Sequence, residues 1–222
     1  MNPSLTAGIW GIAALVALGS PITHAQENGW YAGGNVGRSA ATIDDARITR
    51  GLAAGGLGTA TINDRDRSTG FKVFGGKQLH PNFALEAGLF DLGKFGFAAT
   101  TTPAGSLDGS IRVRGLALDA VGILPINERF SALGRFGLTY AQARDSFSGT
   151  GAVFVNSANP RHSGASYKVG VGLQYAMTDA LGLRAEVERY RVDDAVGHRG
   201  AIDLFSIGLV YRFGGSGPVA VR

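Results

Sequence analysis

Residues Leu204–Phe213 have the sequence LFSIGLVYRF, in which a large apolar side chain returns at every second position. Successive side chains of a β-strand point to opposite faces, so a period of two predicts a strand with one apolar face. That face is one that lipid accepts, and it consists of Phe205, Ile207, Leu209, Tyr211 and Phe213. The other face holds the small or charged residues Ser206, Gly208 and Arg212.

The same alternation occurs in seven further segments, and in each the second face is rich in glycine or in charged residues. The segments are Trp30–Arg38, Gly70–Lys77, Phe83–Leu92, Ile111–Leu124, Phe130–Ala143, Ser166–Tyr175 and Leu181–Tyr190. A soluble sandwich would bury its apolar side chains and expose its charges, whereas a glycine-rich charged face fits the crowded interior of a narrow barrel. The sequence therefore predicts an all-β fold, an eight-stranded antiparallel up-and-down transmembrane β-barrel.

The links between these segments alternate in length. The short links are Gln78–Asn82, Pro125–Arg129 and Ala176–Ala180, and the long ones are Ser39–Thr69, Phe95–Ser110, Arg144–Ala165 and Arg191–Asp203. Up-and-down strands place all short links on one rim and all long links on the other. Outer-membrane barrels have this asymmetry, with periplasmic turns and extracellular loops.

The chain begins with an apolar run, Ala7–Gly19, of the length of a signal-peptide core and too short for a membrane-spanning helix. Small residues at Thr23 and Ala25 form a cleavage triplet, so we expect a signal peptide over 1–25. The barrel is expected over 26–214 and a flexible tail over 215–222. This pattern predicts export to the bacterial outer membrane.

Composition excludes several other classes of protein. The 222 residues include no cysteine, which excludes disulfide frameworks, thiolate zinc sites and thiol catalysis. The net charge is +4 without a basic run, so no nucleic-acid partner is expected. Short acidic loop clusters lack the order of a calcium loop, and no metal or cofactor is predicted.

Several pieces of the sequence, in order along Gly29–Gly214, resemble the transmembrane domain of OmpA-like outer-membrane proteins. The pieces are GWYAG at Gly29–Gly33, FKVFGGKQLHPNFALEAGLFDLG at Phe71–Gly93, LGRFGLTY at Leu133–Tyr140, VGLQYAM at Val171–Met177, LRAEVE at Leu183–Glu188 and FSIGLVYRF at Phe205–Phe213. The resemblance implies that the last piece, with Tyr211 and Phe213, is the signal read by the barrel-assembly machinery. The soluble peptidoglycan-binding domain of many members is missing, so no peptidoglycan binding is expected.

Nine charged residues share the inward phase of the predicted strands. They are Lys72, Glu86, Asp119, Arg135, Lys168, Arg184, Glu186, Glu188 and Arg212. Charges in a partly dehydrated lumen must find partners, so we expect an ion-pair network. The resemblance implies that Glu86 and Arg184 match an interior gate of ion pairs, with Val121 at the position of a gate lysine and Arg135 or Lys72 as its substitute.

Two charged residues, Asp91 and Arg189, fall on the lipid-facing phase. Both lie toward the outer ends of their strands, where a charge costs about 0 to 1 kcal/mol. A β-bulge would move Asp91 off the lipid face.

Three functions follow from these expectations. The first is a non-enzymatic barrel with a structural or surface-display role, which contacts outer-membrane lipid and lipopolysaccharide and meets extracellular ligands through its loops. The second is a low-conductance channel through the ionic lumen. The third, a lipid-modifying enzyme, would need a serine, a histidine and an acid on the outer rim, and the loop histidines His162 and His198 show no such spacing.

Overall fold

The computed structural model describes residues 29–41, 45–153, 161–193 and 199–214. The strands are β1 (Trp30–Ala41), β2 (Gly58–Arg65), β3 (Arg67–His80), β4 (Phe83–Thr102), β5 (Gly105–Pro125), β6 (Phe130–Gly151), β7 (Arg161–Ala176), β8 (Leu181–Asp193) and β9 (Arg199–Arg212). One helix, α1 (Asp45–Ala54), lies between β1 and β2. The predicted signal peptide and tail lie outside the described residues.

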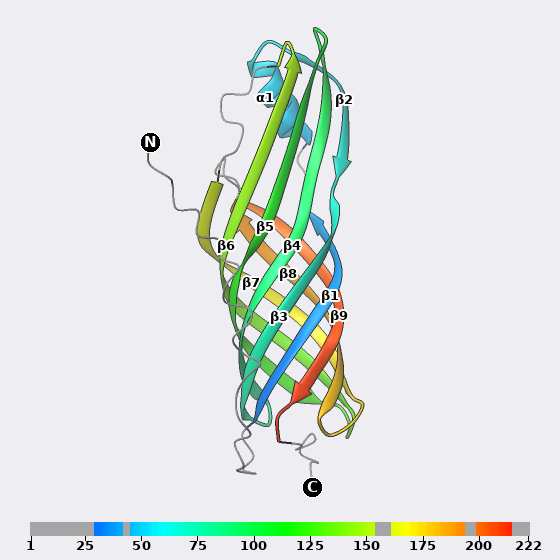
Figure 1. Ribbon diagram of the computed structural model, residues 1–222, viewed down its shortest axis with the longest axis vertical. Helices are drawn as coiled ribbons and strands as arrows, with labels where there is room; N and C mark the ends of the chain where they lie inside the picture. Colours follow the sequence, from blue (N-terminus) through cyan, green and yellow to red (C-terminus); the bar gives the residue numbers. More distant parts are fainter. Residues whose placement is uncertain (1–28, 42–44, 154–160, 194–198, 215–222) are drawn as a thin grey trace, which may run out of the picture.

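Eight of these strands form a closed ring. Each of β3 to β8 pairs antiparallel with the next strand, and β1 pairs with β3. The ring closes where β9 pairs with β1 over eleven registered positions, from Tyr31↔Arg212 to Ala41↔Ile202. Figure 1 shows the tilted strands around the lower half of the molecule. The predicted eight-stranded antiparallel barrel is confirmed.

The predicted orientation of the two faces also agrees with the structure. Large apolar side chains are exposed around the outside of the barrel, among them Leu118 at 57%, Leu138 at 60% and Val171 at 66%. Aromatic side chains gather near the lower ends of the strands, where the rings of Phe130 and Tyr175 lie 4.8 Å apart. Such an apolar belt with an aromatic border is the surface that a barrel presents to lipid.

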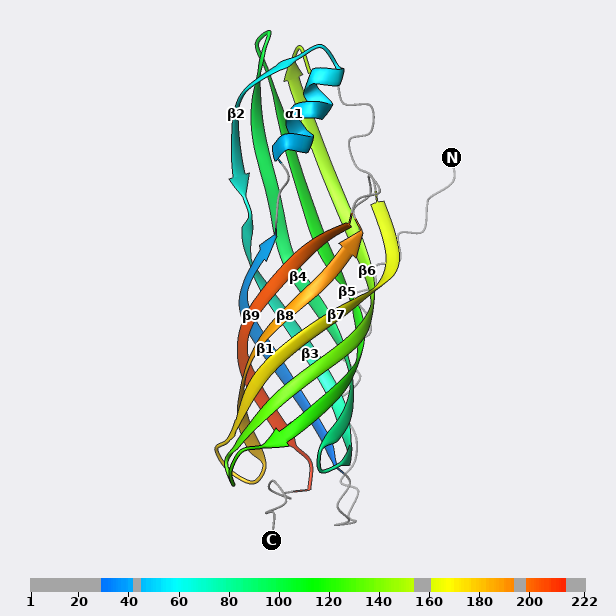
Figure 2. The same cartoon turned by 180° about the vertical axis from the view of Figure 1, so that it is seen from behind.

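Strands β4, β5 and β6 continue far beyond the ring and form an outer sheet. We use this name for β2 together with residues 94–102 of β4, 105–112 of β5 and 144–151 of β6. The strand that is not part of the ring is β2, which among the described strands pairs only with β4, from Gly58↔Thr102 to Arg65↔Gly96. Helix α1 lies beside this sheet at the upper end of the molecule (Figures 1 and 2). In the described part of the chain, no helix is long and apolar enough to cross a membrane.

The outer sheet corrects the predicted long loops. The link expected over Phe95–Ser110 is a continuous hairpin whose turn is Pro103–Ala104. The link expected over Ser39–Thr69 contains α1 and β2, and the strands also extend into the other two long links. The apolar residues Phe95 and Ala99 are buried on one face of the sheet. Pairing and packing between distant segments therefore outweigh the local preference of Gly, Thr and Pro for loops.

A β-bulge marks the level at which β4 leaves the ring. The register with β5 shifts between Asp91 and Gly93, and Gly93 has a φ of +87°, which favours glycine. The Gly93 amide donates a hydrogen bond of 2.8 Å to Asp91, which also pairs with Arg112 at 2.6 Å. The bulge that the sequence analysis offered as one way to accommodate Asp91 is therefore present, and the carboxylate accepts from the Gly93 amide and from Arg112.

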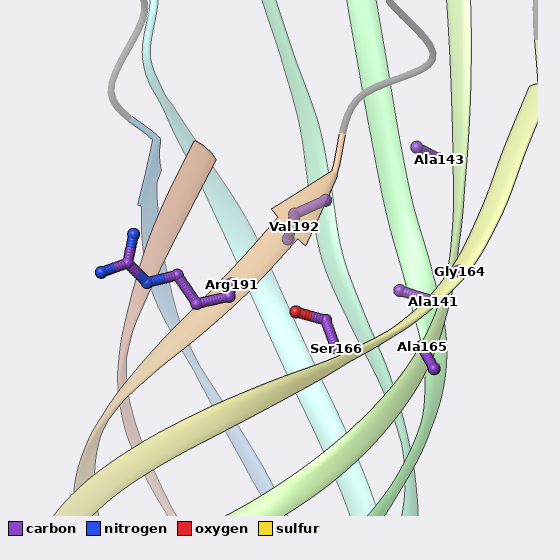
Figure 3. A pocket seen from close by; sticks show the side chains of 7 residues that line it. All are labelled: Ala141, Ala143, Gly164, Ala165, Ser166, Arg191 and Val192. Carbon is purple, nitrogen blue, oxygen red and sulfur yellow. The ribbon is translucent and has the colours of Figure 1, made fainter. Parts of the chain in front are cut away.

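Strands β7 and β8 separate toward the outer end of the barrel. Their pairing ends at Lys168↔Tyr190, whereas β6 and β7 stay paired up to Arg144↔Arg161 and β8 and β9 up to Asp193↔Arg199. A small pocket opens at this seam, with Ala141 and Ala143 on β6, Ser166 on β7 and Val192 on β8 along its walls (Figure 3). The described ladder between β7 and β8 is therefore incomplete at the outer rim.

Candidate functional site

The lumen of the barrel is filled by three layers of side chains. The layer nearest the strand ends with short turns is apolar and consists of Tyr31, Phe74, Ala84, Val121, Leu133 and Val210. The layer toward the outer sheet is apolar as well and consists of Phe90, Leu92, Phe95, Val113, Ala141, Ala143, Tyr190, Val192, Ile202 and Leu204. Charged side chains form the layer between them.

The charged layer brings together eight of the nine residues expected there. Four are basic, Lys72, Arg135, Lys168 and Arg184, and four are acidic, Glu86, Asp119, Glu186 and Glu188. They come from six consecutive strands, β3 to β8, and all eight are buried. The layer is therefore electrically balanced, which is the condition for holding charges in a low-dielectric interior.

Arg135 on β6 occupies the centre of this layer. Its guanidinium lies within 4 Å of every acid of the layer, at 3.0 Å from Glu86, 2.5 Å from Glu186, 3.1 Å from Asp119 and 3.6 Å from Glu188. Its planar array of five donors can serve several carboxylates at once, which a lysine ammonium cannot do in the same way. Arg135 therefore links the two acids of β8 to those of β4 and β5.

The remaining bases bind the acids in pairs around Arg135. Lys168 lies 2.9 Å from Asp119 and 2.6 Å from Glu188, and Lys72 contacts Glu188 at 2.7 Å. Lys72 also forms an ion pair with Glu186. Arg184 lies 2.7 Å from Glu86, so the pair expected from the resemblance is present in the structure.

Neutral polar side chains add hydrogen bonds to the layer. The Tyr31 hydroxyl donates to Glu86 at 2.9 Å, the Asn35 amide donates to Glu186 at 2.8 Å, and Arg184 donates twice to Gln174. Sequence reasoning did not single out these three residues. They share the inward phase of their strands with the charged residues, and that phase is the signal that would have found them.

Glycines on the inward phase leave room for the long charged side chains. A Cβ at Gly137 would lie 1.8 Å from the Asp119 carboxylate, and a Cβ at Gly170 would lie 2.9 Å from the Glu188 side chain. These glycines are therefore required by crowding in the lumen.

Comparison with known proteins places this architecture in a family. The sequence matches the family model described as the OmpA-like transmembrane domain over residues 25–217. The chain belongs to this family. No curated protein sequence matches it.

Solved structures resemble this OmpA-like barrel in fold. Neisserial surface protein A aligns with a TM-score of 0.57 at 10% identity, covering 83% of this chain and 97% of that one. OprG of Pseudomonas aeruginosa aligns at 0.48 with 11% identity, covering 85% and 98%. Ail, the attachment invasion locus protein of Yersinia pestis, aligns at 0.47 with 16% identity, covering 83% and 99%. At these identities, the likeness to the Neisserial protein shows the fold alone.

The positions taken from the family resemblance are occupied as follows. Val121, at the expected position of a gate lysine, is fully buried in the apolar layer. Arg135 is the register partner of Val121 on the neighbouring strand, and its guanidinium forms an ion pair with Glu86. Of the two expected substitutes for the lysine, Arg135 contacts Glu86 directly.

Arg212 corrects the sequence prediction, because it does not join the charged layer. Its register partner on β1 is Tyr31, at the turn end of the barrel, and it lies four residues beyond Gly208, the partner of Arg184. In the described residues Arg212 has no ion pair, and one nitrogen of its guanidinium is buried without a hydrogen bond. The phase of a strand position shows that a side chain points into the lumen. It does not show how far along the barrel axis the side chain lies.

The strand β9 that carries the expected assembly signal ends at Arg212, and Phe213 follows it directly. Tyr211 and Phe213 are 51% and 53% exposed on the outside of the barrel, and their rings meet edge to face at 5.2 Å. Both side chains are therefore accessible from the lipid side at the turn end of the barrel.

The described histidines lie outside any catalytic or metal arrangement. His80 accepts a hydrogen bond from the Asn82 amide within a turn, and His162 is exposed on β7. Within the described ranges no group of three or more histidine, aspartate or glutamate side chains could hold a metal ion. His198 lies outside the described residues.

Proposed function

We propose that this protein is a non-conducting structural barrel of the bacterial outer membrane that holds the outer sheet and α1 at the cell surface. Its surroundings are outer-membrane lipid and lipopolysaccharide, the barrel-assembly machinery inserts it, and extracellular ligands meet it at the outer sheet. No peptidoglycan contact and no chemical reaction are part of this function. The barrel supplies rigidity, and the part above it supplies contact area.

The observation that supports this proposal is the filled lumen. A hydrated ion would have to cross two apolar layers and a layer in which every carboxylate is paired with a cation. An eight-stranded barrel has an interior just wide enough for its own side chains. The charges are therefore best explained as bonds between strands.

The channel function remains the second candidate, because the Glu86–Arg184 pair spans the lumen between β4 and β8. Planar-bilayer recordings of the purified, refolded protein separate the two. We expect no discrete openings from the wild type. Discrete openings that change in Glu86→Ala and not in His162→Ala, a variant of an exposed residue on β7, would overturn the structural proposal.

Surface display is tested by the position of the outer sheet. An epitope inserted between Pro103 and Ala104, the turn of the β4–β5 hairpin, should bind antibody on intact cells. An epitope inserted at Pro81, in the β3–β4 turn at the other rim, should bind only after the outer membrane is permeabilised. The reverse pattern would contradict the proposed orientation.

A lipid-modifying activity receives no support from the described residues. His162 is the described histidine nearest the outer rim, and it has no hydrogen bond to a serine or to an acid in the described part of the chain. Overexpression should leave the acyl composition of lipid A and phospholipid unchanged in mass spectra. A new acylation or deacylation product that disappears in His162→Ala would contradict the proposal.

A further inference from the structure

The seam between β7 and β8 is open although both strands are present at its height. Beyond this height β7 stays paired with β6, and β8 stays paired with β9. Between β7 and β8 the last registered pair in the described residues is Lys168↔Tyr190. Continuation of the same register would bring Tyr167 opposite Arg191 and close the wall. The opening is therefore a separation of two strands, and a shortage of chain does not cause it.

A void lies in this opening and reaches the apolar layer toward the outer sheet. Ala141, Ala143 and Val192 line the void and are also members of that layer. The void measures about 10 Å³, which is close to the smallest volume that holds one water-sized molecule. Because the described ladder between β7 and β8 ends below the void, the two strands can move apart here without breaking a backbone pair. A molecule larger than the void can enter in this way.

The walls of the void favour an uncharged, apolar molecule. Five of the seven lining residues are glycine, alanine or valine, and Ser166 contributes one hydroxyl. Arg191 lies at the rim, with its guanidinium turned away from the other lining side chains (Figure 3). A charged molecule would lose its hydration here without facing an opposite charge. An apolar molecule would gain dispersion contacts with the walls.

The opening lies at the upper edge of the lipid-facing apolar belt. Ala165, on its β7 side, is the register partner of Tyr140. Tyr140 forms a row with Leu116 and Leu89, and this row is the uppermost apolar one on β4 to β6. Acyl chains end near the middle of the bilayer, so they do not present their ends at this height. A small apolar molecule dissolved in the outer leaflet reaches the opening by lateral diffusion.

We propose that the β7–β8 seam is a side entrance through which small apolar molecules pass from the outer leaflet to a binding site in the apolar layer toward the outer sheet. The occupant is an uncharged molecule of the size of xenon or benzene, two molecules that apolar protein cavities bind. The charged layer below is closed by its ion pairs, so the entrance leads to a binding site and not to a pore. This inference rests on the membrane orientation in the proposed function.

The test follows xenon binding to the detergent-solubilised protein by NMR. Xenon should shift the methyl signals of Ala141 and Ala143, and the shifts should saturate as the xenon pressure rises. The methyl signals of Val121 and Leu133, in the other apolar layer, should stay in place. Ala143→Leu fills the void and should abolish the saturable shift at Ala141. Ala132→Leu adds the same bulk on the outward phase of β6 and should bind xenon like the wild type.

A reversible cross-link tests the route of entry. The chain contains no cysteine, so Tyr167→Cys/Arg191→Cys introduces its only two thiols, at positions that the continued register places opposite each other. Oxidation should close the seam and abolish the xenon shifts, and reduction should restore them in the same sample. The single variant Tyr167→Cys is the control, and oxidation should not change its xenon shifts.

Three outcomes would overturn the assignment. They are the absence of a saturable shift in the wild type, a saturable shift that persists in Ala143→Leu, and equal shifts in the oxidised and reduced double variant. All variants should keep heat-modifiable electrophoretic mobility, which shows that the barrel is folded. If Ala143→Leu does not fold, the cross-linked variant decides alone. Xenon binding in detergent does not depend on conductance or on the epitope positions, so this inference and the proposed function can fail separately.

Discussion

At the scale of single residues, Arg135 and Gly37 show two different requirements of the narrow barrel. Arg135 is a buried cation that contacts all four acids of its layer. Removal of one partner from a buried ion pair leaves an uncompensated charge, which costs far more than the pair contributes. Gly37 is required by the closeness of two backbones at the point where the ring closes.

Replacement of Arg135 by methionine should lower the free energy of unfolding by about 3 to 5 kcal/mol, since four acids would then share three bases. Arg212→Met is the control, because Arg212 has no ion pair in the described residues, and its variant should be close to the wild type. Urea unfolding in lipid vesicles measures both. Similar losses in the two variants would show that the charged layer is not cooperative.

Replacement of Gly37 by alanine should weaken the closure between β1 and β9. The added Cβ would lie 1.8 Å from the Phe205 carbonyl oxygen, so the backbones must move apart, at a cost of about 1 to 3 kcal/mol. At Gly34, three residues earlier on β1, the nearest atoms lie at 3.6 and 3.7 Å, an ordinary contact. Gly34→Ala should therefore unfold like the wild type in the same assay, and a stable Gly37→Ala variant would contradict the register of β1 and β9.

At the scale of elements, the seam between β7 and β8 is an incomplete part of the ring. Above Lys168, β7 pairs with β6 and has no registered pairing with β8. Backbone amides without a ladder partner exchange with solvent more easily than those within a ladder.

Amide hydrogen exchange should reveal this seam. In β7, alternate amides over residues 162–167 should exchange faster than those over 169–175, which lie between two paired strands. The β5–β6 ladder, registered without a shift from Pro125↔Ser131 past the same height, is the internal reference and should stay protected. Uniform protection along β7 would mean that β8 pairs with it in solution over its full length.

The strands of the ring could be predicted from sequence because the lipid-facing side requires apolar residues and the lumen side carries small or charged ones. This selection gives a strict period of two, as in Phe205–Phe213. The bulge at Asp91 was predictable for the same reason, since a carboxylate on the lipid phase signals a break in register. In the outer sheet, lipid no longer requires an apolar face. Apolar residues still alternate there, as in Phe95, Phe97 and Ala99, but the Gly and Thr residues between them are also common in loops.

The sequence predicted which residues form the charged layer, except for Arg212. It did not predict which of these residues contact each other. Strand phase shows that Glu86 and Arg135 point inward, but the contact between them depends on the stagger of strands across the ring. That stagger is fixed by pairings of segments far apart in sequence, such as β1 with β9.

At the scale of the whole molecule, the sealed barrel and the outer sheet are separable. The ring is closed by pairings below the bulge, whereas the outer sheet depends on the extensions of β4, β5 and β6. Replacement of Gly96–Ser110 by Asn-Gly, which favours a two-residue hairpin, should leave the ring intact. The variant should keep its resistance to detergent until it is boiled, while protease should cleave α1 and β2. Loss of the heat-modifiable band would show that the ring needs the outer sheet.

The balance of four bases and four acids is reached only when β8 is in place. Lys72, Glu86, Asp119, Arg135 and Lys168 alone, from β3 to β7, have a surplus of one positive charge. The three charges of β8, Arg184, Glu186 and Glu188, cancel that surplus. A sheet that lacked β8 would therefore hold one unmatched positive charge. We expect this charge to disfavour release of an incomplete barrel into the bilayer.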